Sequence, residues 1–168
     1  MTALTLFAPF VVGVLVHNAE EALWLPRWST SAGRWHRGVG AAEFRFGAVV
    51  LSAALVVVAL LAAHFGPRSI AATVFFGAVF AMVANALVPH LVVSLATRRY
   101  MPGTATGLLL NLPLGGLLLH RGVAEQWIDV ATIVWAGPLV ALGLVASIPL
   151  LFALGRRCSG TQRRDRDS

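Results

Sequence analysis

Three ionisable side chains interrupt the first apolar stretch of the chain. His17, Glu20 and Glu21 are spaced i, i+3 and i+4, so in a helix they project from one face. An imidazole and two carboxylates at hydrocarbon depth cost several kcal/mol unless they are paired, protonated or bound to a metal ion. We therefore expect this group to carry chemistry, either as ligands of a divalent cation or as a proton donor and acceptor.

Further polar side chains lie in later apolar stretches and extend this candidate site. Asn85 and His90 belong to the third stretch, with Pro89 between them, and Asn111 belongs to the fourth. Since a proline has no N–H to donate, we expect a kink that turns Asn85 and His90 towards one cavity. Counted along each stretch at roughly 1.5 Å per residue, all these side chains fall in the cytoplasmic half of a membrane. We predict that they meet.

Imidazole and carboxylate ligands suit zinc, non-haem iron or manganese. We predict that one or two divalent ions are bound by four side chains: His17, Glu20, Glu21 and His90. Four residues are the candidates for catalysis: Glu20, Glu21, Asn85 and Asn111. A carboxylate that is not a ligand would act as general base or acid, and an asparagine would orient substrate or stabilise an oxyanion. Trp24 continues the stripe of His17, and we predict that Trp24 and Asn85 contact the substrate.

The composition indicates that these residues lie in a membrane. Hydrophobic residues make up 58% of the 168 positions and charged residues 12%, and the mean hydropathy is +0.79. Soluble domains carry roughly 25% charged residues. Five apolar segments reach the length of about 17 residues that a spanning helix needs: about 4–25, 43–64, 69–96, 104–120 and 128–154. None shows the alternation of a barrel strand. We predict an all-α fold, a polytopic membrane bundle of five transmembrane helices.

We expect residues 1–155 to form a single transmembrane domain and the basic tail, residues 156–168, to be disordered and cytoplasmic. Five spans place eleven of the 13 basic residues on one side of the membrane: Arg27, Arg34, Arg37, Arg45, Arg98, Arg99, Arg156, Arg157, Arg163, Arg164 and Arg166. The other side holds Arg68 and Arg121. By the positive-inside rule, we expect an inner-membrane protein with its N-terminus outside and its C-terminus in the cytoplasm. The net charge of +6 follows from this asymmetry and does not indicate a nucleic-acid partner.

The string His17-Asn18-Ala19-Glu20-Glu21 resembles the signature of the HXXEE family of small, predominantly bacterial membrane proteins. Asn85, His90 and the turn Tyr100-Met101-Pro102-Gly103-Thr104-Ala105-Thr106 resemble later blocks of that family. The resemblance covers roughly residues 10–120. It implies an integral membrane protein with its site at these residues, and it implies no particular reaction.

We predict a membrane-embedded, metal-dependent enzyme whose hydrophobic substrate, a lipid-, isoprenoid- or polyketide-like molecule, enters from the membrane lipids. Acid–base and Lewis-acid groups suffice for hydrolysis, isomerisation, cyclisation or dehydration. No nucleotide-binding motif is present, so no nucleotide cofactor is expected. Three alternatives remain: a metal-free acid–base isomerase, a small proton-coupled transporter in which Glu20 and Glu21 alternate between protonated and ionised forms, and a purely structural hydrogen-bonded cluster between helices.

Overall fold

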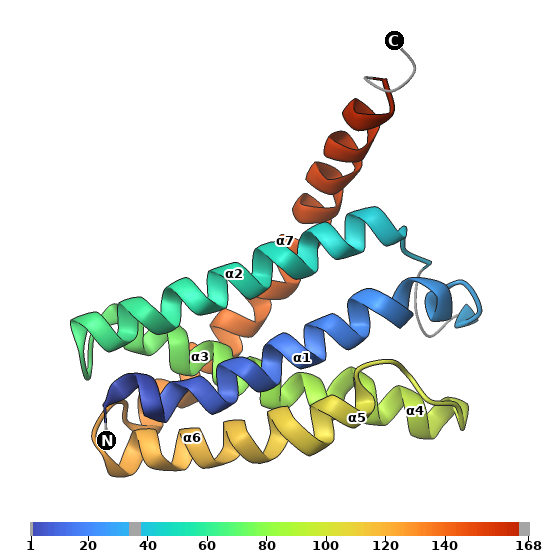
Figure 1. Ribbon diagram of the computed structural model, residues 1–168. Coiled ribbons are helices and arrows are strands. Elements are labelled where there is room, and N and C mark those ends of the chain that lie inside the picture. Colours follow the sequence, from blue (N-terminus) through green and yellow to red (C-terminus); the bar gives the residue numbers. More distant parts are fainter. Residues whose placement is uncertain (1, 34–37, 165–168) are drawn as a thin grey trace.

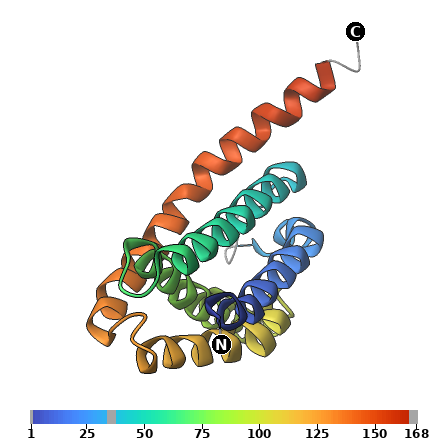
Figure 2. The ribbon, with the colours of Figure 1, turned by 60° about the vertical axis from the view of Figure 1, so that its left-hand side comes forward.

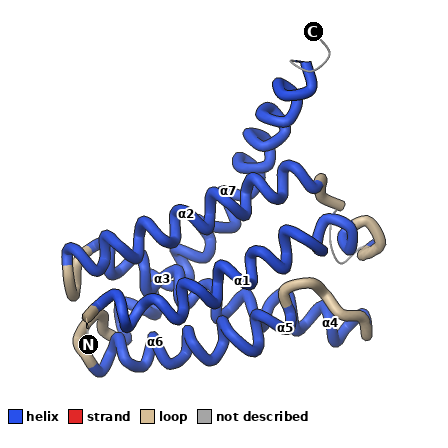
Figure 3. The backbone as a smooth tube through the Cα atoms, viewed as in Figure 1, coloured by secondary structure: helices blue, strands red, loops and turns tan. Residues whose placement is uncertain are grey.

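The five apolar stretches of the sequence form five long helical segments (Figure 1). The computed structural model describes residues 2–33 and 38–164. Its elements are α1 (Ala3–Ser29), α2 (Ala41–Phe65), α3 (Ile70–Asn85), the π-helix η2 (Ala86–Leu91), α4 (Val92–Thr97), α5 (Thr104–Thr106), the π-helix η3 (Gly107–Asn111), α6 (Leu112–Ala124) and α7 (Val130–Arg164). In the described residues, five helical segments are long and apolar enough to cross a membrane, and there is no strand (Figure 3). The predicted all-α, five-helix architecture is confirmed.

Helix α7 is the longest element, and its C-terminal part stands away from the other helices (Figure 2). The structure describes it as helical to Arg164, and the disorder of the tail, residues 156–168, stays a prediction. Arginine has a good helix propensity, so a basic segment can continue a helix that precedes it. Residues 165–168, and with them Arg166, lie outside the described residues, as do Arg34 and Arg37 in the segment between α1 and α2.

Aromatic side chains fix one end of the bundle. Phe7 in α1 packs against Phe75 in α3 with the ring centroids 4.5 Å apart, and against Trp127 at 4.9 Å. Phe7, Phe75 and Phe76 are at most 1% exposed. Gly122 in α6 lets Phe76 approach the helix backbone, because a Cβ at this position would lie 2.2 Å from the phenyl ring. This packing holds α1, α3 and α6 in the register that positions the polar residues further along α1.

The third long segment is kinked at Pro89, as the sequence predicted. Val88 has φ −130° and ψ 115°, which are not helical values, and residues Ala86–Leu91 form a π-helix. A proline cannot donate to the preceding turn, and π-helical turns are frequent where a helix must re-aim a side chain. His90, in this turn, is 1% exposed. The kink therefore brings an imidazole into the interior of the bundle.

A second irregular segment faces this kink. It consists of the turn Arg98–Gly103 and the π-helix Gly107–Asn111, and it packs against η2 and α1. Ser94 fastens the turn, because its hydroxyl accepts the Met101 N–H at 3.0 Å and lies 2.8 Å from the Thr104 hydroxyl. Gly107 permits close approach of the two segments, since a Cβ there would lie 3.2 Å from that of Ala86. The two irregular segments and α1 together surround the polar residues.

Candidate metal centre

Two imidazoles and one carboxylate from two separate helical segments converge in the interior of the bundle. His17 in α1 is 0% exposed and His90 in η2 is 1% exposed, and their ring centroids lie 5.0 Å apart with the rings perpendicular. The Glu21 carboxylate lies against both rings: Oε1 is 3.2 Å from His90 Nε2, and Oε2 is 3.6 Å from His17 Nε2. The predicted meeting of His17, Glu21 and His90 is thus found in the structure.

The donor set and its spacing fit a divalent cation. One ligand atom from each of His17, Glu21 and His90 can be chosen so that all three lie within 4.8 Å of one another. Ligands bound tetrahedrally at about 2.0–2.2 Å from a zinc ion lie roughly 3.4 Å apart. In the structure, one Glu21 oxygen lies 3.2 Å from His90 Nε2 and the other lies 3.6 Å from His17 Nε2. Two imidazoles and a carboxylate also suit non-haem iron and manganese. These three residues, which we call the ligand group, could hold a metal ion.

Asn85 lies beside this group. Its amide nitrogen, Nδ2, is 3.3 Å from His17 Nε2. An amide nitrogen can only donate, so in this arrangement Nε2 accepts with its lone pair. The side chain of Asn85 thus lies beside the candidate ligand atom of His17.

The two consecutive glutamates have different partners. Glu20 was predicted as a ligand together with Glu21, but the structure turns its carboxylate towards the Arg98–Thr106 segment and away from the ligand group. Three donors bind it there: the Tyr100 hydroxyl and, at 2.9 Å, the Gly103 N–H bind Oε1, and the Thr106 hydroxyl binds Oε2 at 2.6 Å. The two carboxylates differ in direction because consecutive residues of a helix point about 100° apart. Both carboxylate oxygens of Glu20 are occupied by protein donors.

Thr106 connects this carboxylate to the first imidazole. Its Oγ1 lies 3.0 Å from His17 Nδ1, the ring nitrogen that faces away from Glu21. Sequence reasoning named the Tyr100–Thr106 turn only for its resemblance to a family and gave Tyr100, Gly103 and Thr106 no role. The available signal was chemical: hydroxyl side chains flank a Pro-Gly turn that follows the helix carrying His90.

Gly103 closes the site from the side of the turn. Its φ of +92° lies in the left-handed region, which glycine adopts at no steric cost. A Cβ at this position would lie 2.5 Å from His90 Cε1 and 2.9 Å from His17 Cε1. The backbone of the turn therefore packs directly against both imidazole edges and leaves no room for a side chain.

Two other predicted residues lie outside the ligand group. The Trp24 side chain is 57% exposed, so Trp24 lies on the surface of the bundle and the structure does not bring it to the site. At that level the buried face of α1 has shifted to Leu25, which packs with Val93 and Met101. Asn111 is 0% exposed and lies beside Gly13, one helical turn before His17. Among the described residues its amide has no hydrogen-bond partner.

The phenol of Tyr100 belongs to the turn between the helical segments, and its environment favours the neutral form. Tyr100 is 54% exposed, and the partial burial of its phenol is the first cause that raises the pKa of Tyr100. The hydrogen bond to the Glu20 carboxylate is the second cause. The neutral phenol is the form that can donate to Glu20, so the raised pKa keeps this hydrogen bond intact up to alkaline pH.

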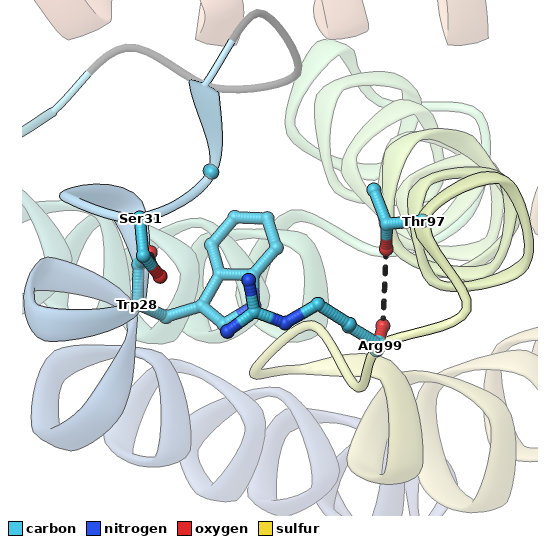
Figure 4. A pocket seen from close by; sticks show the side chains of 5 residues that line it. Trp28, Ser31, Thr97 and Arg99 are labelled. Carbon is cyan, nitrogen blue, oxygen red and sulfur yellow. Dashed lines mark hydrogen bonds between the residues drawn. The ribbon is translucent and has the colours of Figure 1, made fainter.

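A surface pocket of about 230 Å³ lies near the ends of α1 and α4 (Figure 4). Its lining consists of Trp28, Ser31, Ala32, Thr97 and Arg99. Figure 4 shows Arg99 extending towards the indole of Trp28. No member of the ligand group lines this pocket.

Comparisons with known proteins identify the family of the chain. Residues 6–118 match the family described as "Protein of unknown function with HXXEE motif". The chain is 33% identical over 150 residues to the "Uncharacterized protein YrkK" of Bacillus subtilis (strain 168), and this alignment covers 89% of the chain and 95% of that relative. No solved structure matches significantly. The matched range includes His17, Glu20, Glu21 and His90, and the chain belongs to the HXXEE family.

Proposed function

We propose that the protein is a metal-dependent enzyme of the inner membrane that acts on a hydrophobic substrate. The observation that carries this proposal is the convergence of His17, Glu21 and His90, whose ligand atoms lie within 4.8 Å of one another in the interior of an apolar bundle. The Glu21 carboxylate lies against the Nε2 atoms of both imidazoles, and an ionised carboxylate in a low-dielectric medium is costly unless a cation or a proton donor compensates its charge. A divalent cation removes that cost.

The side chains around the ligand group suit acid–base chemistry. A bound divalent ion would supply Lewis-acid activation of a substrate oxygen or of water. Asn85 offers an amide beside the ligand atom of His17 and can orient a polar substrate group. Glu21 is the most accessible of the three ligands, with a side chain 17% exposed, so substrate can approach from its side. Hydrolysis, isomerisation, cyclisation and dehydration are the reactions that such groups can perform.

The surroundings of the site favour a substrate that enters from lipid. Leu87 and Val88, next to Pro89 in the kinked segment, are 39% and 64% exposed. In a bilayer these apolar side chains would face hydrocarbon within one turn of His90. A lipid-, isoprenoid- or polyketide-like molecule could reach the ligand group by this route without crossing an aqueous phase.

The arginine distribution supports the orientation with the N-terminus outside and the C-terminus in the cytoplasm. Arg98 and Arg99 lie in the turn that also carries Tyr100 and Gly103, so the proposed site is near the cytoplasmic end of the bundle. The same end carries Arg45, whose side chain donates to the carbonyl of Ala22 in α1.

The decisive experiment is elemental analysis of the protein purified in detergent and reloaded with Zn²⁺, Mn²⁺ or Fe²⁺. We expect stoichiometric metal in the wild type and only a small fraction in His17→Ala, His90→Ala or Glu21→Ala. His64→Ala and Glu43→Ala are the matched controls and should keep the metal, because they remove the same side-chain types far from the ligand group. A wild-type protein that binds none of the three ions overturns the metal role.

A further inference from the structure

The carboxylate of Glu20 reaches the candidate ligand His17 through a single hydroxyl group. Thr106 Oγ1 lies 2.6 Å from Glu20 Oε2 and 3.0 Å from His17 Nδ1, and it has one proton to donate. A carboxylate oxygen can only accept, so the proton of Thr106 points to Glu20. The carbonyl oxygen of Gly103 is a competing acceptor, but at 3.4 Å it is much more distant.

This direction of donation determines which nitrogen of His17 carries the proton. If Thr106 donates to Glu20, its oxygen must accept from the imidazole, and His17 Nδ1 must be the N–H. The lone pair of His17 is then on Nε2, the nitrogen that lies 3.6 Å from Glu21 Oε2. The amide nitrogen of Asn85, which can only donate, lies 3.3 Å from the same Nε2 and requires the same tautomer.

We propose that Glu20 and Thr106 are positioning residues that hold His17 in the Nδ1–H tautomer and so present its Nε2 lone pair to a metal ion. Glu20 is itself fixed by the Tyr100 hydroxyl and the Gly103 N–H, so the whole turn contributes to this arrangement. Hydrogen bonds to the second nitrogen of a histidine ligand commonly fix its orientation and raise its basicity. The inference rests on the proposed metal function, although the tautomer itself can be measured without metal.

Glu20→Gln tests the proposal most sharply because it preserves shape and reverses the direction of the hydrogen bonds. The carboxamide oxygen can still accept from Tyr100 and Gly103, and its NH₂ group then faces Thr106. The Thr106 hydroxyl accepts from this group and donates its own proton to His17 Nδ1, which moves the imidazole proton to Nε2. We expect the Nε2–H tautomer and a metal affinity lower by about 10- to 100-fold.

Two readouts separate this proposal from the proposed function. The first is ¹⁵N nuclear magnetic resonance of histidine-labelled, metal-free protein in detergent, with His17 assigned by its loss in His17→Gln. The second is the Zn²⁺ affinity, measured by competition with a chelating dye. Thr106→Val should lose the preference for Nδ1–H and weaken Zn²⁺ binding by about 10- to 100-fold, and Thr106→Ser should restore both.

The matched controls are Thr97→Val and Glu43→Gln. The Thr97 hydroxyl donates to the Val93 carbonyl at 2.7 Å, and the Glu43 carboxylate accepts from Gly40 and Arg156, so neither contacts the ligand group. Both variants should bind Zn²⁺ as the wild type does. If Thr106→Val does not fold, the tautomer of His17 and the Zn²⁺ affinity can still be compared between Glu20→Gln, Thr106→Ser and the wild type.

A wild-type His17 with its proton on Nε2 overturns the proposal, and so does a Glu20→Gln protein that keeps the Nδ1–H tautomer and wild-type Zn²⁺ affinity. A wild-type protein that shows the Nδ1–H tautomer but binds no metal overturns the proposed function alone. The two failures are therefore distinguishable in one set of samples.

Discussion

At the scale of single residues, neighbouring carboxylates acquire different roles from their partners alone. Glu21 lies against the Nε2 atoms of two imidazoles, whereas Glu20 accepts hydrogen bonds from Tyr100, Gly103 and Thr106. A carboxylate with three donors is already satisfied and gains little from a cation. A carboxylate against imidazole nitrogens needs a cation or a proton between them. The sequence Glu-Glu thus provides one candidate ligand, Glu21, and one residue, Glu20, that is anchored to the Tyr100–Thr106 turn by hydrogen bonds.

The ionisation of Tyr100, the single tyrosine of the chain, provides a measure of its hydrogen bond to Glu20. Because burial and the Glu20 hydrogen bond both raise the pKa of Tyr100, we expect its phenol to ionise above the usual value of about 10. The neutral phenol is the donor, so the hydrogen bond persists at lower pH and is lost as the pH rises through the raised pKa. An ultraviolet titration of phenolate absorbance in detergent measures this midpoint directly.

Glu20→Gln is the matched comparison for that titration. The carboxamide removes the negative charge and keeps the burial, so the midpoint should fall towards the usual value without reaching it. Glu43→Gln, which contacts neither Tyr100 nor the turn, should leave the midpoint unchanged. A wild-type midpoint equal to that of N-acetyltyrosinamide in the same detergent contradicts the structure at Tyr100.

The sequence predicted the ligand group more successfully than the residues that hold this group in place, which are Glu20, Gly103 and Thr106. Helical spacing, the proline at position 89 and equal depth along the spans were enough to predict that His17, Glu21 and His90 meet, because each of these signals can be read within a single span. Spacing could not separate Glu20 from Glu21, since a helical face is wide and the partner of each depends on a turn distant in sequence. The role of Thr106 depends on the positive φ of Gly103, which no periodicity reveals.

At the scale of elements, two irregular segments make the site possible. The kink at Pro89 carries His90 inward, and the turn before α5 covers both imidazoles with backbone atoms. The apolar lengths of the spans were readily predicted, since lipid-spanning helices need long apolar runs. The sequence did not predict that the buried face of α1 shifts from Trp24 to Leu25, because this shift depends on the packing of Val93 and Met101 near the end of the bundle.

Gly103→Ala tests the contribution of the turn. A Cβ would overlap both imidazole edges, at 2.5 Å and 2.9 Å, and an alanine at φ +92° is strained. We expect Zn²⁺ affinity to fall by at least about 10-fold, since the two ligands must move apart. Thermal unfolding in detergent should also occur at a lower temperature.

Gly66→Ala is the control that separates the effect of backbone strain from the effect of steric overlap with the imidazoles. Gly66 has φ +80°, but nothing lies within 4 Å of a Cβ built there. Both variants should therefore lose roughly 1–3 kcal/mol to backbone strain, and only Gly103→Ala should lose metal affinity. If both variants bind Zn²⁺ as the wild type does, the turn does not define the site.

At the scale of the whole molecule, the asymmetric distribution of arginines predicts the orientation of the bundle in the membrane, and with it the side on which the candidate site lies. The proposed orientation puts the Arg98–Gly103 turn and the end of α7 on the cytoplasmic side, and the loop between α6 and α7 outside. Eight arginines precede Cys158 in the described residues. Six of them lie on the proposed cytoplasmic side (Arg27, Arg45, Arg98, Arg99, Arg156 and Arg157), and two lie on the proposed outer side (Arg68 and Arg121). The candidate site would then be closer to the cytoplasm than to the outer face.

The single cysteine of the chain tests this orientation without any mutation. Cys158 is free and exposed near the end of α7. We expect a membrane-impermeant maleimide to label it in inverted membrane vesicles and to leave it unlabelled in intact spheroplasts, because the basic end of α7 remains in the cytoplasm. Ala124→Cys in a Cys158→Ser background places the only thiol at the exposed end of α6 and should give the opposite pattern. Labelling of Cys158 in spheroplasts would show that the bundle is inverted, and the candidate site would then lie near the outer face.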